Sequence, residues 1–257
     1  MGKYLILESL LLVSVSCGFQ QEPKPENQFT LRKMSNVTTD ISTPDSNLDK
    51  PIESFSDDSH IGRPHKNKIQ IEIVKRADSD TGYKPNNVAR INFYSINHNK
   101  EWILKQTLEI EDYALAESDP KTTDFNNDGL KDLTFVSNTA ARGANEVRTL
   151  LIYDKNSDSL IRIKNSEDYP NLAYNETLNC IDSWMVHGAS TTVFLRLAGD
   201  ELKEFASVGT GANSTGECCG LEVGVIDKDG KETVIKRKKI AEDEIYTRYR
   251  TFNPPRP

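Results

Sequence analysis

The chain has 257 residues, of which 28 % are charged, with a formal net charge of -7 at pH 7 and a mean hydropathy of -0.59. This length allows one or two domains, and the polar composition predicts a well-solvated chain. The acidic balance argues against nucleic acid as a partner, because phosphate binding needs concentrated Lys and Arg. The basic run at 236–239 is followed by acidic residues at 242–244, which favours a balanced exposed surface.

The N-terminus carries a predicted targeting signal. An apolar stretch at 4–15 is too short to span a bilayer but suits a secretory signal peptide, which we place at residues 1–16. Cys17 follows small residues, as in the lipobox of bacterial lipoproteins, and we expect it to be lipidated. Glu8 and Ser14 depart from that motif, so ordinary cleavage is the alternative. The predicted location is the bacterial cell envelope, as an outer-membrane lipoprotein facing the periplasm or the cell surface, with the membrane contacted through the lipid anchor.

Residues 17–66 are predicted to form a lipidated, disordered tether. The stretch is rich in Ser, Thr, Asn, Asp, Glu and Pro and lacks a sustained apolar period. It cannot bury enough surface to offset the entropy of ordering. As a flexible coil it would span roughly 35–40 Å, which suits holding a domain away from a membrane.

From residue 67 the pattern changes to short apolar runs. Residues 69–73 alternate apolar and polar side chains, as a half-buried strand does. Further runs of this kind are separated by turn residues, and no long helical period occurs among them. The pattern predicts one all-β domain at 67–257, built of antiparallel hairpins in a sandwich or a small propeller-like arrangement. The other strand candidates are 89–96, 102–110, 147–153, 160–163, 178–186, 192–197, 202–208, 221–226 and 233–235.

The most distinctive motif is Asp124-Phe-Asn-Asn-Asp-Gly-Leu-Lys-Asp132. Acidic or amide side chains stand at alternate early positions, and Gly at the sixth allows the chain to reverse. Calcium takes about six to eight oxygen ligands, which a loop of this pattern supplies. The Asp132-Leu-Thr-Phe stretch that follows predicts a strand, unlike the exiting helix of an EF-hand. A solvated turn between two strands is the alternative. The predicted calcium ligands are the side chains of Asp124, Asn126, Asp128 and Asp132 and the backbone carbonyl of Leu130.

Three cysteines follow the predicted export signal, and an exported chain meets an oxidising compartment. An odd number leaves one thiol outside a disulfide. We expect Cys180 to pair with Cys218 or Cys219, while a bond between the adjacent cysteines is the less favoured alternative. The spacing does not indicate zinc, because no second cysteine or histidine pair stands at ligand distance.

No catalytic motif stands out. The chain lacks a Gly-x-Ser-x-Gly elbow, a His-Glu-x-x-His zinc motif and a phosphate-binding glycine loop. We therefore expect a protein that is not an enzyme. A carbohydrate-active enzyme is the alternative, since two carboxylates about 5–10 Å apart are enough for glycoside hydrolysis.

The motif at 124–132, the Leu-Thr-Phe strand, a Gly/Asn loop and Leu-Leu-Ile-Tyr-Asp at 150–154 together resemble a group of bacterial envelope lipoproteins. That group includes the immunity lipoproteins that neutralise lysozyme-like effectors delivered by type IV secretion. Its domain is similar to the i-type lysozyme inhibitors, compact antiparallel β structures with bound calcium. The loop also resembles the FG-GAP or VCBS repeat unit, which occurs here once. The resemblance covers roughly residues 115–208.

The resemblance implies an exported lipoprotein that binds another envelope protein, most concretely by inhibiting a lysozyme-like peptidoglycan hydrolase. In such inhibitors a loop enters the hydrolase cleft; here the corresponding segment is 137–148, which lacks the group's Ser-Gly or Tyr motif. We expect a partner-binding loop with Arg142, Asn145 and Arg148, whose cations would pair with the cleft carboxylates. Ordinary loop cations are the alternative. A calcium-stabilised adhesion or ligand-binding module is the alternative function.

Overall fold

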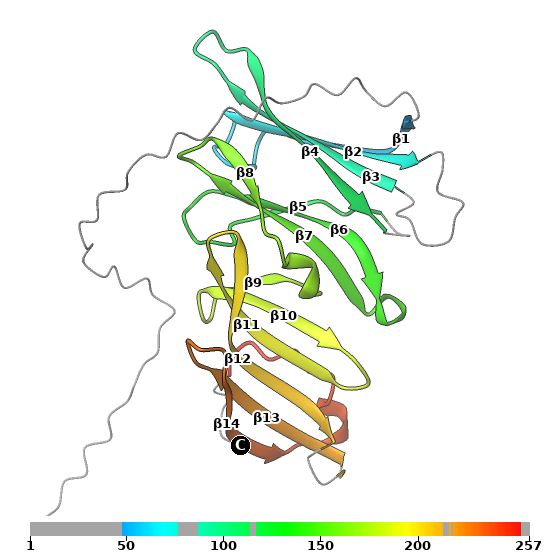
Figure 1. Cartoon of the computed structure of the whole chain (residues 1–257), viewed down its shortest axis with the longest axis vertical. Coiled ribbons are helices and arrows are strands. Elements are labelled where there is room, and N and C mark those ends of the chain that lie inside the picture. Colours follow the sequence, from blue (N-terminus) through cyan, green and yellow to red (C-terminus); the bar gives the residue numbers. More distant parts are fainter. Residues whose placement is uncertain (1–47, 77–86, 114–116, 213–215, 217, 253–257) are drawn as a thin grey trace, which may run out of the picture.

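The computed structural model describes residues 48–76, 87–113, 117–212, 216 and 218–252. The predicted signal peptide and Cys17 lie outside these residues. The fold is all-β, as the sequence predicts, and its three antiparallel sheets are stacked one after another (Figure 1). In every sheet the strands lie in chain order, so that each strand pairs with the next one along the chain. Nothing among the described residues forms a helix long and apolar enough to cross a membrane.

The first sheet begins before the expected start of the domain. Residues 48–57 form a strand paired with the next one, and Phe55 packs against the core, so the expected tether ends too late. The segment has few apolar side chains and no clear period, but its backbone hydrogen bonds to a neighbouring strand order it. Glu53 adds a tertiary contact by accepting a hydrogen bond from the Ser118 N–H at 3.0 Å. The strands of this sheet are β1 (Leu48–Asp57), β2 (Asn67–Arg76), β3 (Asn87–Ile96) and β4 (Trp102–Asp112).

The second sheet lies in the middle of the stack and is covered on both faces. Along its strand β7, Leu151 and Tyr153 face the first sheet, whereas Leu150 and Ile152 face the third. Side chains alternate across a strand, so a continuous apolar run at these four positions is what a doubly covered strand requires. The strands of this sheet are β5 (Lys121–Thr123), β6 (Asp132–Ala140), β7 (Asn145–Asp154) and β8 (Ser159–Arg162).

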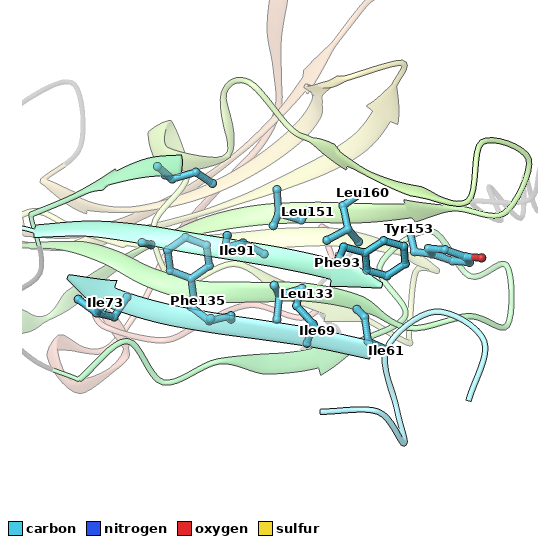
Figure 2. Packing of buried hydrophobic residues seen from close by; sticks show 13 residues of the cluster. Ile61, Ile69, Ile73, Ile91, Phe93, Leu133, Phe135, Leu151, Tyr153 and Leu160 are labelled. Carbon is cyan, nitrogen blue, oxygen red and sulfur yellow. The ribbon is translucent and has the colours of Figure 1, made fainter. Parts of the chain in front are cut away.

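The interface between the first and second sheets is a dry cluster of aliphatic and aromatic side chains (Figure 2). The Phe93 and Tyr153 rings meet there with centroids 5.8 Å apart. The first cluster comprises Ile61, Ile69, Ile71, Ile73, Ala89, Ile91, Phe93, Ile110, Leu133, Phe135, Leu151, Tyr153 and Leu160.

A polar network closes one end of the first cluster. The Asp158 carboxylate accepts hydrogen bonds from the Arg63 guanidinium at 2.5 Å, the Tyr153 hydroxyl at 2.9 Å and the Asn67 amide at 3.0 Å. Asn67 is fully buried and also donates to the Ser95 hydroxyl at 2.8 Å. Because a buried amide without partners would destabilise the fold, these contacts tie the two sheets together.

The third sheet packs one face against the middle sheet and the other against the C-terminal segment 240–252. Phe194 and Phe205 on this outer face meet Phe252 of the C-terminal segment, with ring centroids 5.6–6.3 Å apart. Single 3-10 turns lie at Ala141–Gly143, Ser166–Asp168 and Glu242–Glu244. The strands are β9 (Ala173–Asn175), β10 (Cys180–Val186), β11 (Ser190–Ala198), β12 (Glu201–Ala212), β13 (Cys218–Ile226) and β14 (Glu232–Lys239).

An ionic clamp fastens the C-terminal segment to β10. The Asp182 carboxylate is fully buried and meets the Arg248 guanidinium, whose Nε lies 3.1 Å from Oδ1. Arg250 Nη1 lies 3.0 Å from Oδ2, and the Asn175 amide donates to the same oxygen at 2.7 Å. A buried carboxylate is tolerated when it is paired and hydrogen-bonded in this way.

The cysteine pairing differs from the favoured prediction. The disulfide joins Cys218 to Cys219, the adjacent pair, and not either of them to Cys180. Cys180 and Cys219 are both buried in the cluster under the C-terminal segment. Sequence spacing did not indicate this outcome. Cys180 begins β10, whereas Cys218 and Cys219 lie on β13, and strands β11 and β12 separate the two in the sheet.

Candidate functional site

The predicted calcium loop connects β5 to β6 at the edge of the middle sheet. Asn127 has φ 57° and Gly129 has φ 86°, and these left-handed conformations turn the chain back on itself. An added Cβ on Gly129 would meet nothing within 4 Å, so the backbone conformation and not space favours glycine there. Gly62 donates its N–H to the Lys131 carbonyl at 2.8 Å, which attaches the loop to the β1–β2 connection.

Within the loop the side-chain oxygens accept hydrogen bonds from the loop's own backbone. The Asp124 carboxylate accepts from the N–H groups of Asp128 at 3.2 Å and Gly129 at 2.8 Å. The Asn126 Oδ1 also accepts from Asp128, at 3.1 Å, and the Asp128 Oδ1 accepts from Leu130 at 2.8 Å. These bonds preorganise the turn and use oxygens that the sequence assigns to a metal.

Asp132 has a structural role in addition to the one predicted. It is fully buried and accepts the N–H of Phe125 at 2.7 Å and of Tyr153 at 2.9 Å, which joins the loop to β7. Burial raises the pKa of Asp132 to about 7, although the two hydrogen bonds lower it. The negative charges of Asp124 and Asp128 add to the rise. Three carboxylates therefore lie within electrostatic reach of one another.

The donor set suits calcium by its chemistry, since every predicted ligand offers an oxygen. In the described part of the chain, however, no three His, Cys, Asp or Glu side chains come together as a metal-binding group. The Asp124 and Asp128 oxygens accept loop N–H groups, and each carboxylate oxygen keeps a second lone pair that could face an ion. The side chain of Leu130 packs against the first cluster and has no ligating atom, so this residue can offer only its backbone carbonyl.

The predicted partner-binding loop is shorter than the sequence suggested. The β6–β7 pairing continues to Ala140 and Asn145, so only a tip at 141–144 remains outside the strands. All four tip residues are exposed, and Ala141, Arg142 and Gly143 have positive φ. Among the described residues the Arg142 side chain forms no hydrogen bond or ion pair. The tip therefore presents one unpaired cation.

Asn145 and Arg148 do not lie on the exposed tip where the sequence pattern predicts them, because both are buried and have partners within the fold. Asn145 is buried and exchanges hydrogen bonds with the Val186 backbone at 2.9 and 3.0 Å, joining β7 to β10. The Arg148 side chain is 3 % exposed, with Nη1 2.9 Å from Glu146 Oε2 and Nη2 2.5 Å from the Asp119 carbonyl oxygen. The sequence alone does not show whether an arginine in such a segment is exposed or is buried by strand pairing.

A groove of about 510 Å³ between the second and third sheets was not predicted. Its lining comes from six separate parts of the chain, so no local motif marks it. Two arginines held in ion pairs and several aromatic rings line it together with polar side chains. The lining residues are Lys121, Thr123, Phe125, Thr134, Glu146, Arg148, Asn171, Leu172, Ala173, Tyr174, Glu176, Trp184 and Arg248.

Comparisons with known proteins give the chain no family. No family model matches it, and no curated protein matches it. The fold has a distant likeness to a solved structure of a Xanthomonas type IV secretion system related protein, with 14 % sequence identity and a TM-score of 0.45. The match covers 74 % of this chain and 97 % of that one. A likeness of this size carries no argument about function.

Proposed function

We propose that this chain is an exported lipoprotein that binds another protein in the cell envelope through the tip at 141–144. The observation that carries the proposal is the tip itself: an exposed cation, Arg142, at the end of a hairpin whose neighbouring cation is buried and paired. Such an arrangement leaves a single protruding charge for a partner.

The base of the tip is held on both sides. The Asn171 amide donates to the Ala144 carbonyl at 3.0 Å, and the Ala144 N–H donates to the Ala141 carbonyl at 3.2 Å. Asn145 bonds to β10 immediately after the tip. A preordered loop loses less conformational entropy on binding than a mobile one.

The partner that we favour is a lysozyme-like peptidoglycan hydrolase. Its cleft holds a pair of carboxylates, and the Arg142 guanidinium can bind one of them bidentately. The net charge of -7 suits a basic enzyme, because complementary charge raises the association rate and makes it salt-sensitive. On this proposal the chain acts by occupying the cleft.

The test is inhibition of peptidoglycan hydrolysis by the purified chain, measured against several lysozyme classes. We expect inhibition of at least one class, and Arg142→Ala should weaken it about tenfold, as loss of a central interface residue does. Lys228→Ala, which removes an exposed turn cation elsewhere, is the matched control. Absence of inhibition in every class, or equal inhibition by the Arg142 variant, would refute the hydrolase assignment.

We further propose that the loop at 124–132 binds calcium. The support is its all-oxygen donor set and the buried Asp132 held near two other carboxylates, whose mutual repulsion a cation would relieve. Asp124, Asn126 and Asp128 would turn free lone pairs of their oxygens toward the ion, and Asp132 would keep the loop attached to β7.

Calcium that binds only the folded state stabilises it by mass action. Calcium at 100 times its dissociation constant should therefore raise the free energy of unfolding by about 2.7 kcal/mol relative to a chelator. Asp128→Ala should abolish that difference, whereas Asp229→Ala, in a β-turn of similar composition, should leave it unchanged. Equal melting temperatures with calcium and with chelator in the unmodified chain would exclude the site.

A further inference from the structure

The groove between the second and third sheets has the composition of a binding site, and we propose that it binds a neutral oligosaccharide. Its volume of about 510 Å³ lies within the range of about 300–1,000 Å³ that is usual for small-molecule sites. The tip residues 141–144 do not line it, although Asn171 lines the groove and also holds the Ala144 carbonyl at the base of the tip.

Part of the groove lining is apolar and aromatic. Phe125 and Leu172 are 5 % and 7 % exposed, and Tyr174 and Trp184 line the groove beside them. Aromatic side chains combine an apolar ring with a polar edge, so they suit ligands that have both kinds of surface. The C–H faces of a sugar ring are such a surface, with hydroxyls around the rim.

The rest of the lining includes charged side chains, but its cations already have partners. Arg148 binds Glu146 and Asp119, Lys121 Nζ lies 2.6 Å from Asp119 Oδ2, and Arg248 is held by the buried Asp182. An anionic ligand would find no unpaired cation among the described lining residues and would lose its hydration. A hydroxyl both donates and accepts, so it can bind to either member of such a pair without disturbing the charge balance.

An unsatisfied donor adds an independent reason for a ligand. The indole N–H of Trp184 is buried, yet no acceptor lies within hydrogen-bond distance of it in the described part of the chain. Its neighbour Asn171 bonds to the Trp184 carbonyl at 2.8 Å, which holds this residue in place beside the groove. A buried donor without an acceptor destabilises a fold. On this proposal, an oxygen of the ligand accepts the hydrogen bond that the Trp184 indole N–H lacks within the described part of the fold.

The test uses calorimetric titration of the purified full chain with two neutral trisaccharides, cellotriose and triacetylchitotriose. At least one should bind. Trp184→Phe keeps an aromatic ring but removes the N–H donor, and it should weaken binding about tenfold. Trp102→Phe is the matched control, because it replaces the other tryptophan of the chain, on β4 of the first sheet. The control also leaves Trp184 as the sole tryptophan, whose selectively excited emission should shift on titration.

A purely structural role of Trp184 predicts a different result. Removing an unsatisfied buried donor should leave the melting temperature equal or higher, so a fall in affinity without a fall in stability supports the site. Equal affinity of both tryptophan variants, or failure of both trisaccharides to bind, would overturn the proposal. Arg142→Ala should not change saccharide affinity, which separates this inference from the hydrolase proposal.

Discussion

The two faces of the middle sheet are built in opposite ways. Toward the first sheet, 13 buried residues form a continuous dry cluster that the Asp158 network closes at one end. Toward the third sheet, nine buried residues share the interface with the groove and its ion pairs. One strand, β7, supplies side chains to both. The first interface, the dry face, is a continuous apolar cluster that stabilises the stack. The second, the polar face, combines a smaller apolar cluster with the groove in which we propose a ligand.

The largest expected effect comes from a cavity in the dry face. Phe135 is fully buried in the first cluster, and Phe135→Ala should lower the free energy of unfolding by about 3–5 kcal/mol. Leu172→Ala, at the groove, should lower it by about 2 kcal/mol, because an open site collapses or hydrates more readily. Urea unfolding of both variants measures the contrast. Equal losses would show that the two faces do not differ in this way.

The polar face depends on the clamp that holds Arg248 in the groove wall. Asp182→Ala should lower the free energy of unfolding by about 2–3 kcal/mol, less than a fully buried pair, because Arg248 and Arg250 are 26 % and 43 % exposed. Asp182→Asn keeps the shape and tests the charge alone. Thermal unfolding provides the measurement, and a loss below about 0.5 kcal/mol in both variants would contradict the clamp.

The smallest effect concerns acid stability at the closed end of the dry face. Burial raises the pKa of Asp158, but hydrogen bonds from Ser95, Tyr153 and Asn67 outweigh it, so the pKa is lowered from its ordinary value. The unfolded value is about 3.9, and the carboxylate therefore contributes stability above that pH and loses it as the pH falls through the lower folded value. Asp158→Asn should cost about 1–2 kcal/mol at pH 7 and less at pH 3. A constant difference across this range in pH-dependent urea unfolding would contradict this role.

The sequence predicts the fold class well because period two and turn residues are local signals. The antiparallel hairpins follow from these signals. The continuous apolar run in β7 marks it as a strand that is covered on both faces. β1 was missed because its order comes from backbone pairing and not from an apolar pattern. The roles of Arg148 and Asn145 depend on where the β6–β7 pairing ends, which spacing alone does not fix. The groove escaped prediction because distant segments build it.

The strict chain order of the strands has a consequence for how the protein is made. Every strand pair joins neighbours in sequence, so the contacts are short-range for an all-β protein, and such topologies fold comparatively fast. A chain that emerges N-terminus first can complete the first sheet before the second exists, and each finished sheet offers an apolar template to the next. Until the third sheet arrives, Leu150 and Ile152 stay exposed to solvent. Truncation before β9 should therefore produce a protein prone to aggregation during biosynthesis.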